Sequence, residues 1–232
     1  MDKVLLFDID GTLVLTGGAG VQAMFRAFAE IFGIANGLDG VDMAGRSDVA
    51  ILRNALDKNA ISTADFPDQV RRFRAAYRRH LADTLREVTG GHVLPGVRDL
   101  LSALQPLPGV RLGLATGNFR EGAELKLSHY GLWHFFSGGA FGEDSEERAP
   151  LVAAAIKRMG DDRDGQNSPT FYVIGDTVYD VEAAKANGAV AVAVTTGRTP
   201  ADRLRAAGAD LLFSDLSDWR AVLAALGLGA VS

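Results

Sequence analysis

Residues 5–14 read LLFDIDGTLV, and this stretch decides the fold because two aspartates end an apolar, strand-sized run. Asp8 and Asp10 are two residues apart, so in an extended segment their side chains project to the same side. Two carboxylates this close repel each other unless a cation or a shared proton offsets their charge. The stretch is therefore either a polar turn or a functional site.

The composition limits the classes of protein to consider. The chain has 232 residues, 47% of them hydrophobic, which suits one large domain with an insertion. Its 24 Lys and Arg against 29 Asp and Glu give a formal charge of -5, which argues against binding nucleic acid by bulk electrostatics. The absence of cysteine excludes disulfides and thiolate catalysis, and no apolar run approaches the ~20 residues that span a bilayer. We expect a cytoplasmic monomer or homodimer with no nucleic-acid or membrane partner.

Short apolar runs, several rich in β-branched residues, alternate with helix-length amphipathic segments. This alternation predicts βα units and a parallel sheet that is buried on both faces. The expected fold class is therefore α/β, with a Rossmann-like parallel-sheet core, and residues 160–169 (GDDRDGQNSP) form a polar surface loop. The strand-sized runs are residues 4–7, 110–114, 171–174, 190–194 and 211–213.

Residues 17–91 break the alternation, because they show helical periodicity and no convincing strand. Ser47 suits the N-cap of a helix, and Pro67 suits a first helical turn. We expect an all-helical domain of residues 17–91, inserted into a core domain made of residues 1–16 and 92–232.

Polar side chains follow three of the predicted strands, at the sheet edge where ligands bind in open parallel sheets. They supply four carboxylates, a hydroxyl and an amide, and so many carboxylates need a cation. Oxygen ligands without His or Cys favour a hard ion such as Mg²⁺. A carboxylate in such a site can attack phosphorus while a second one protonates the leaving oxygen. The residues concerned are Asp8 and Asp10, then Thr116, Gly117 and Asn118, then Asp176 and Asp180.

The motifs DIDGTL at residues 8–13, TGN at 116–118 and GDTVYD at 175–180 resemble those of the haloacid dehalogenase superfamily of hydrolases, in order and spacing as well as composition. The helical segment after the first strand is similar to that superfamily's helical cap, as in its phosphoglycolate phosphatase and beta-phosphoglucomutase branches. The resemblance covers essentially the whole chain. It implies a cap that closes over the substrate.

The resemblance also implies Mg²⁺ as the cofactor and a role for each motif residue. Asp8 would be the nucleophile and Asp10 the general acid/base. Asp8, the backbone carbonyl of Asp10, and Asp176 would bind Mg²⁺. Thr116 would hydrogen-bond the phosphoryl group, and Asp180 would lie close to the metal or orient the site's cation. The residues expected to bind substrate or phosphate are Gly11, Gly117, Asn118 and, from the cap, Arg46.

The cation of the site is the one departure from the family's pattern, which usually has a Lys before the helix preceding GDTVYD. Arg148, in ERAPL at 147–151, is the best match and keeps the charge with a different geometry. Lys157, about two turns later, is the alternative. Arg46 either meets a substrate carboxylate or second phosphate, or is a stray side chain at a helix start. The arginines between residues 71 and 86 are typical of a solvated basic face.

Asp10 favours phosphate-ester chemistry, since the corresponding position in the dehalogenase branch of the family is not an acid. We expect a Mg²⁺-dependent phosphatase that hydrolyses a small phosphorylated metabolite, of the phosphoglycolate phosphatase kind, through an aspartyl-phosphate. A sugar-phosphate mutase is one alternative. A catalytically idle regulatory or binding protein that keeps the fold is the other.

Overall fold

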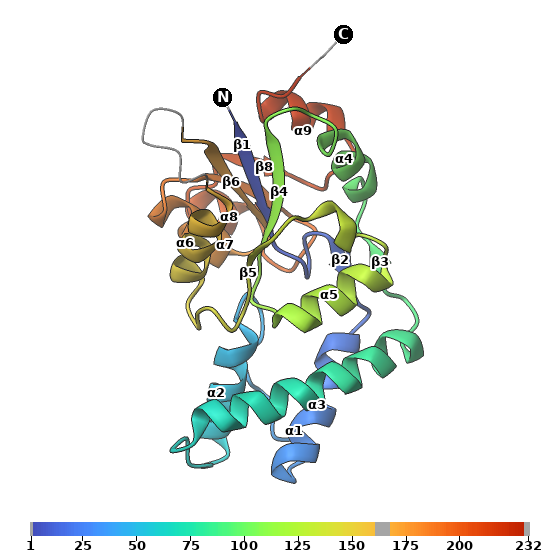
Figure 1. Ribbon diagram of the computed structural model, residues 1–232, viewed down its shortest axis with the longest axis vertical. Helices are drawn as coiled ribbons and strands as arrows, with labels where there is room; N and C mark the ends of the chain where they lie inside the picture. Colours follow the sequence, from blue (N-terminus) through green and yellow to red (C-terminus); the bar gives the residue numbers. More distant parts are fainter. Residues whose placement is uncertain (1, 161–167, 230–232) are drawn as a thin grey trace.

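The computed structural model describes residues 2–160 and 168–229, and its core is a six-stranded sheet flanked by helices (Figure 1). The strand order is β5-β4-β1-β6-β7-β8, and neighbouring strands pair in parallel. The predicted α/β parallel-sheet core is therefore confirmed, while most of the predicted loop at 160–169 lies outside the described residues. The strands are β1 (Lys3–Phe7), β4 (Val110–Ala115), β5 (Gly139–Ala140), β6 (Thr170–Gly175), β7 (Val190–Val194) and β8 (Leu211–Phe213).

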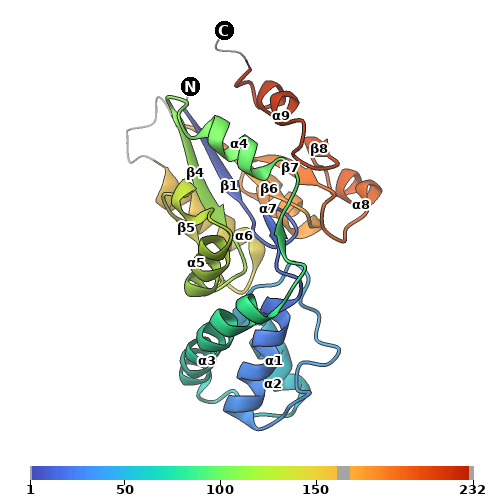
Figure 2. The same ribbon diagram turned by 90° about the vertical axis from the view of Figure 1, so that its right-hand side faces the viewer.

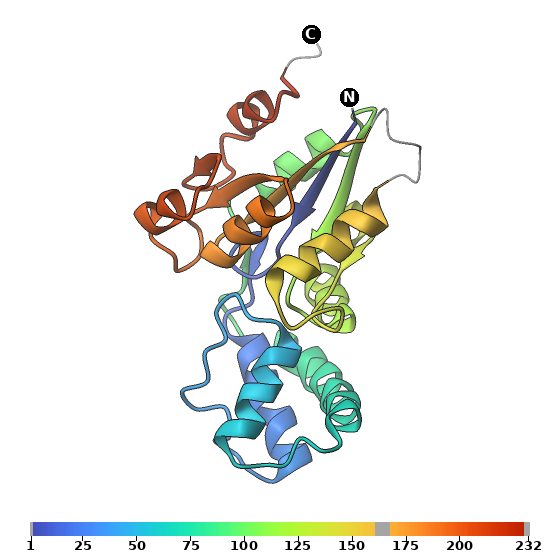
Figure 3. The ribbon, with the colours of Figure 1, turned by 90° about the vertical axis from the view of Figure 1, so that its left-hand side faces the viewer.

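Strand β1 lies in the middle of the sheet, because it pairs with β4 on one side and β6 on the other. Its side chains alternate between two apolar layers. Leu5 and Phe7 pack on one face, and Val4 and Leu6 pack on the other, all fully buried. Figures 2 and 3 show the helices on the two faces. The first layer contains α4 (Val97–Leu104), α5 (Arg120–His129) and α9 (Trp219–Ala225), and the second contains α6 (Arg148–Met159), α7 (Val178–Ala186) and α8 (Ala201–Ala206).

Three further helices form a separate layer beyond the carboxyl ends of the strands, seen at the bottom of Figure 1. They are α1 (Ala19–Phe32), α2 (Asp48–Lys58) and α3 (Phe66–Glu87), and they enclose their own apolar core. Helix α2 begins after Ser47, whose hydroxyl accepts a hydrogen bond from Ala50 N at 3.2 Å. Pro67 lies in the first turn of α3, where its missing N–H costs nothing. We call these three helices the cap helices.

A short antiparallel ribbon joins the cap helices to the sheet domain. Strand β2 (Val14–Leu15) precedes α1, and β3 (His92–Val93) follows α3. Val14 aligns with Val93, and Leu15 aligns with His92. Two residues are too few to show a strand periodicity, so this ribbon has no signal in the sequence. It ties the two chain crossings between the domains together.

The cap helices also contact the sheet domain through rings and ion pairs. Phe119, just before α5, is fully buried, and its ring centroid lies 6.5 Å from that of Phe73 and 6.2 Å from that of Tyr77. Arg53 binds both carboxylate oxygens of Glu146, at 2.6 and 2.7 Å. Arg74, one of the arginines predicted to lie on a solvated face, instead pairs with core-domain Glu121 at 2.6 Å and Glu143 at 2.9 Å. Within the described residues, no helix is long and apolar enough to cross a membrane.

Candidate active site

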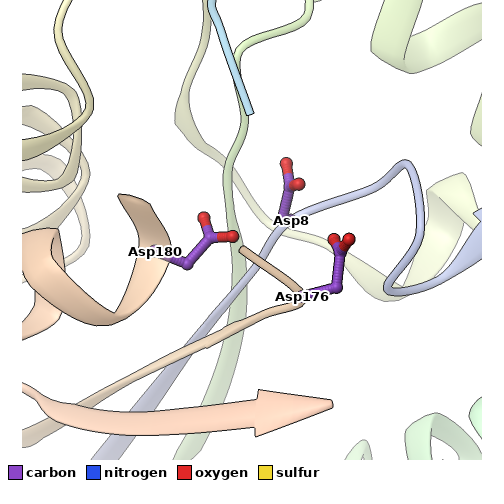
Figure 4. Close-up of side chains that lie close together, drawn as sticks. All are labelled: Asp8, Asp176 and Asp180. Carbon is purple, nitrogen blue, oxygen red and sulfur yellow. The ribbon is translucent and has the colours of Figure 1, made fainter. Parts of the chain in front are cut away.

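Asp8 lies where β1 ends, at the edge of the sheet that faces the cap helices. Its N–H donates to Ile174 O of β6 at 2.9 Å, so the sheet ladder holds its backbone. Figure 4 shows Asp8, at the end of β1, lying close to Asp176, which follows β6, and to Asp180, at the start of α7. The Asp8 side chain is 10% exposed, and burial raises the pKa of its carboxyl, while the nearby Arg148 opposes that rise.

The chain turns sharply after Asp10. Ile9 O accepts hydrogen bonds from the backbone N–H groups of residues 12, 13 and 14, at 2.9–3.3 Å. Gly11 has φ +85°, and a Cβ there would lie 2.6 Å from Asp176 Oδ2. Thr12 Oγ1 donates to Asp176 Oδ1 at 3.2 Å. The turn therefore brings the first motif directly against Asp176, and position 11 has no room for a side chain.

Asp176 follows β6 and lies in a crowded acidic site. Burial, followed by the charges of Asp180 and Asp8, raises the pKa of Asp176 to about 8. One carboxylate oxygen from each of these three residues lies within 4.8 Å of the others. Repulsion of this kind is relieved by a bound cation, and an all-oxygen donor set suits Mg²⁺. The residues present therefore fit the predicted metal site.

Arg148 begins α6, and its guanidinium bridges two carboxylates. Nη2 lies 2.9 Å from Asp8 Oδ1 and 2.5 Å from Asp180 Oδ1, and Nε donates to Asp180 Oδ1 at 2.8 Å. Asp180 Oδ2 accepts from Thr177 N at 3.1 Å and Thr177 Oγ1 at 2.7 Å in the capping box of α7. Both Asp180 oxygens are thus engaged, which fits a residue that orients the site's cation. Lys157 lies exposed, farther along α6.

Thr116, Gly117 and Asn118 follow β4 on the other side of Asp8. Asn118 Nδ2 donates to Thr116 Oγ1 and to Asp10 Oδ2, both at 2.9 Å. The segment just before cap helix α2 packs closely against Gly117, because a Cβ at Gly117 would lie 2.4 Å from Arg46 O. Gly117 O also accepts from Asp48 N of α2 at 2.7 Å.

Arg46 lies at this boundary between the cap helices and the sheet domain. Its guanidinium carbon is 4.9 Å from the ring centroid of Tyr179, and its Nε is 3.8 Å from Asp42 Oδ2. The side chain is 43% exposed. The structure therefore places Arg46 against α7, with its backbone rather than its side chain next to Gly117.

Lys126 is a member of the site that sequence reasoning missed. It lies on α5, and its Nζ donates to Asp10 Oδ2 and to Asn118 Oδ1, each at 2.6 Å. The signal was a lysine on the apolar side of a helix, next to buried Ala123 and Leu127. Such a lysine needs a carboxylate partner, and the first motif supplies one.

Comparison with known proteins agrees with this geometry. A family model described as haloacid dehalogenase-like hydrolase matches residues 3–188. The phosphoglycolate phosphatase of Synechococcus elongatus is 33% identical over 217 residues, which cover 93% of this chain and 94% of that protein. The phosphoglycolate phosphatase of Escherichia coli O157:H7 is 28% identical over 96% of this chain and 91% of its own.

Solved structures share the fold at lower sequence identity. A hydrolase from Pseudomonas syringae superposes with a TM-score of 0.69 at 22% identity, over 99% of this chain and 100% of that one. A Thermotoga maritima protein provisionally described as a beta-phosphoglucomutase gives 0.61 at 22% identity, over 97% and 100% of the two chains. At this level of identity, the likeness concerns the fold.

The fold, the converging aspartates and the family match define a class of α/β hydrolases with an aspartate at the end of the first strand. The chain belongs to the haloacid dehalogenase-like hydrolase family. Its curated relatives include phosphatases, and the predictions of this family, of the α/β core and of a phosphoric monoester hydrolase are confirmed.

Proposed function

We propose that this hydrolase is a Mg²⁺-dependent phosphatase that hydrolyses a small phosphomonoester through an aspartyl-phosphate on Asp8. One observation carries the proposal. Asp8 lies buried at a strand end with Arg148 on one side, at 2.9 Å, and an acidic metal-type cluster that includes Asp176 on the other. A carboxylate flanked in this way can approach the phosphorus of a dianionic ester, because Arg148 and a cation held by the acidic cluster would offset the repulsion.

Asp8, the backbone carbonyl of Asp10, and Asp176 would hold the Mg²⁺ ion. When bound, it would supply positive charge toward the phosphoryl oxygens and toward the acidic cluster. Asp180 takes no direct part in this assignment, because its oxygens already bind Arg148 and Thr177. Its contribution is to fix the guanidinium of Arg148, which can donate to the phosphoryl group along with the Thr116 hydroxyl.

In the first step an Asp8 carboxylate oxygen bonds to phosphorus as the ester P–O bond breaks. Asp10 transfers its proton to the departing alcohol oxygen. In the second step Asp10, now a carboxylate, takes a proton from water while the water oxygen bonds to phosphorus. The bond between phosphorus and Asp8 then breaks, which releases inorganic phosphate and restores both aspartates.

The contact between cap and site supports a small substrate. The backbone of the cap meets the phosphate-binding stretch directly, through the hydrogen bond from Asp48 N to Gly117 O. Closure of such a cap over the ester would exclude bulk water and so strengthen the electrostatic contacts of the phosphoryl group with the site. The named activity of the curated relatives makes 2-phosphoglycolate the first substrate to test.

The test is release of inorganic phosphate from a panel of phosphorylated metabolites that includes 2-phosphoglycolate. Asp8→Asn should abolish turnover, and the exposed Asp202→Asn on α8 is the matched control. Activity that survives Asp8→Asn, or that persists in a chelator, contradicts the proposal. Conversion of a sugar 1-phosphate to its 6-phosphate without phosphate release would indicate the mutase instead. A chain that turns over no ester would indicate the idle binding protein.

A further inference from the structure

Lys126 is unusually buried for a lysine, because its side chain is only 5% exposed. A buried ammonium is strongly unfavourable unless it is paired and hydrogen-bonded. The pairing here is with Asp10 Oδ2 at 2.6 Å and with Asn118 Oδ1 at 2.6 Å. The Asp10 side chain itself is 43% exposed. One side of that carboxylate is therefore anchored on Lys126, and the other side is open.

The anchor fixes which oxygen of Asp10 is free. Oδ2 accepts from Lys126 Nζ at 2.6 Å and also from Asn118 Nδ2 at 2.9 Å. The two hydrogen bonds to the same oxygen hold the carboxyl plane in one orientation. Oδ1 is then the oxygen left to carry the proton for the leaving group.

Lys126 also determines the orientation of Asn118. An ammonium has donors only, so the amide oxygen of Asn118 must face it. The amide nitrogen must then face the opposite way, where it donates to Asp10 Oδ2 and to Thr116 Oγ1. A single cation thus orders the amide of Asn118, the carboxyl of Asp10 and the hydroxyl of Thr116.

The fold leaves room for this cation at the base of the cap. Gly20, in the first turn of α1, lies beside the lysine, and a Cβ there would be 3.2 Å from Lys126 Nζ. The ammonium also acts on Asp48, whose pKa its charge lowers against the effect of burial. Lys126 therefore sits where the first turns of two cap helices meet the site.

We infer that Lys126 is a positioning residue for Asp10, one that holds its free oxygen toward the leaving group of the substrate. The inference rests on the proposed function, in which Asp10 protonates that group. Arg148 is the cation of Asp8, and Lys126 is the cation of Asp10. The effect of removing Lys126 should accordingly depend on how much protonation the leaving group needs.

The experiment compares two esters in the same enzyme. 2-Phosphoglycolate releases an alcohol that needs a proton, whereas p-nitrophenyl phosphate releases a phenolate that does not. We measure kcat/KM, which reports only the steps up to the first irreversible one and so isolates formation of the aspartyl-phosphate. Lys126→Met should lower kcat/KM by about 100-fold for the alkyl ester and by less than about threefold for the aryl ester. Lys126→Arg should recover part of the loss, because it keeps the charge.

Equal losses for both esters would overturn the inference, because a purely structural defect has no preference for a leaving group. Exposed Lys185→Met, on α7, is the matched control and should change neither ester. If Lys126→Met does not fold, Gly20→Ala gives the second test, since it crowds Nζ while raising helix propensity. It should lower the alkyl rate at least threefold more than the aryl rate, and an unchanged ratio would count against the inference.

The outcomes also separate this inference from the proposed function. A wild-type enzyme that hydrolyses neither ester, or that keeps its activity as Asp8→Asn, overturns both. A wild type that needs Asp8, combined with a Lys126→Met variant that loses both esters equally, overturns the positioning role alone.

Discussion

The first prediction concerns Asp48, a buried carboxyl at the start of cap helix α2. Its Oδ2 accepts from Phe119 N of the sheet domain at 2.7 Å, while its own N–H donates to Gly117 O at 2.7 Å. Asp48 therefore makes hydrogen bonds to two backbone positions, residues 117 and 119, of the segment that joins β4 to α5. Replacing Asp48 by Asn keeps an oxygen for the Phe119 N–H and removes the charge, so the variant isolates the cost of burying that charge.

The magnitude follows from the pKa. Burial raises the pKa of Asp48 from 3.8 to about 7, against the opposing effects of Lys126 and of the hydrogen bond from Phe119. Because the folded-state pKa is the higher one, the folded protein binds the proton more tightly, and Asp48 contributes stability at low pH. That contribution is full below pH 3.8, declines as the pH rises, and is lost above about pH 7. At about 1.4 kcal/mol per pH unit, the loss between pH 5 and pH 8 is about 3 kcal/mol.

The assay is urea unfolding of wild type and Asp48→Asn at pH 5 and pH 8. The free energy of unfolding of the variant, relative to wild type, should rise by about 3 kcal/mol between the two pH values. Other titrating groups are common to both proteins, so their effects cancel in the difference. Asp57→Asn, exposed on the same helix, should show a difference within about 0.5 kcal/mol at both pH values. A difference for Asp48→Asn that stays constant, or that falls with pH, would refute the reasoning.

Three further predictions follow from the site. Mg²⁺ at 100 times its Kd should stabilise the fold by about 2.7 kcal/mol and raise Tm by about 5–10 °C; a chelator should reverse the shift, and an Asp176→Asn variant that keeps it would contradict the metal assignment. Arg148→Met should lower kcat/KM at least about 100-fold and lower the free energy of unfolding by about 3–5 kcal/mol, because it leaves two buried carboxylates uncompensated. Lys157→Met should keep kcat/KM within about twofold of wild type, and comparable losses in the two variants would contradict the assignment of the cation. Gly11→Ala should lose most of the Mg²⁺-induced Tm shift, because its Cβ would press on Asp176, while Gly188→Ala, with a similar positive φ in open space, should cost about 1–2 kcal/mol and keep that shift.

Much of the fold could be predicted, because its signals are local. The five strand-sized runs are mostly apolar, as expected for a parallel sheet covered on both faces, and each lies within a strand of the structure. The starts of two cap helices are also marked locally, α2 by the capping Ser47 and α3 by Pro67 in its first turn. The β2–β3 ribbon could not be predicted in the same way, because each of its strands has only two residues and its partner lies far away in the sequence.

The residues of the site also differ in how far local motifs predict them. Asp8, Asp10, Thr116 and Asp176 could be named because each follows a strand whose carboxyl end faces the same edge of the sheet. Arg148 begins a helix rather than following a strand, and the packing of α6 against the sheet brings it to Asp8 and Asp180.

Lys126 shows most clearly why the rest could not be read from the sequence. It stands eight residues after Asn118 on a helix, and nothing in that spacing points to Asp10, which is 116 residues away. The buried ammonium is tolerated only because the sheet carries Asp10 and Asn118 to the same point, and because Gly20 leaves a gap for it in the cap. The two cations of the site therefore differ in origin. Arg148 stands where the sequence predicted the cation of the site, while Lys126 depends on the contact between sheet and cap, so the pairing of Asp10 is a property of this chain's tertiary structure.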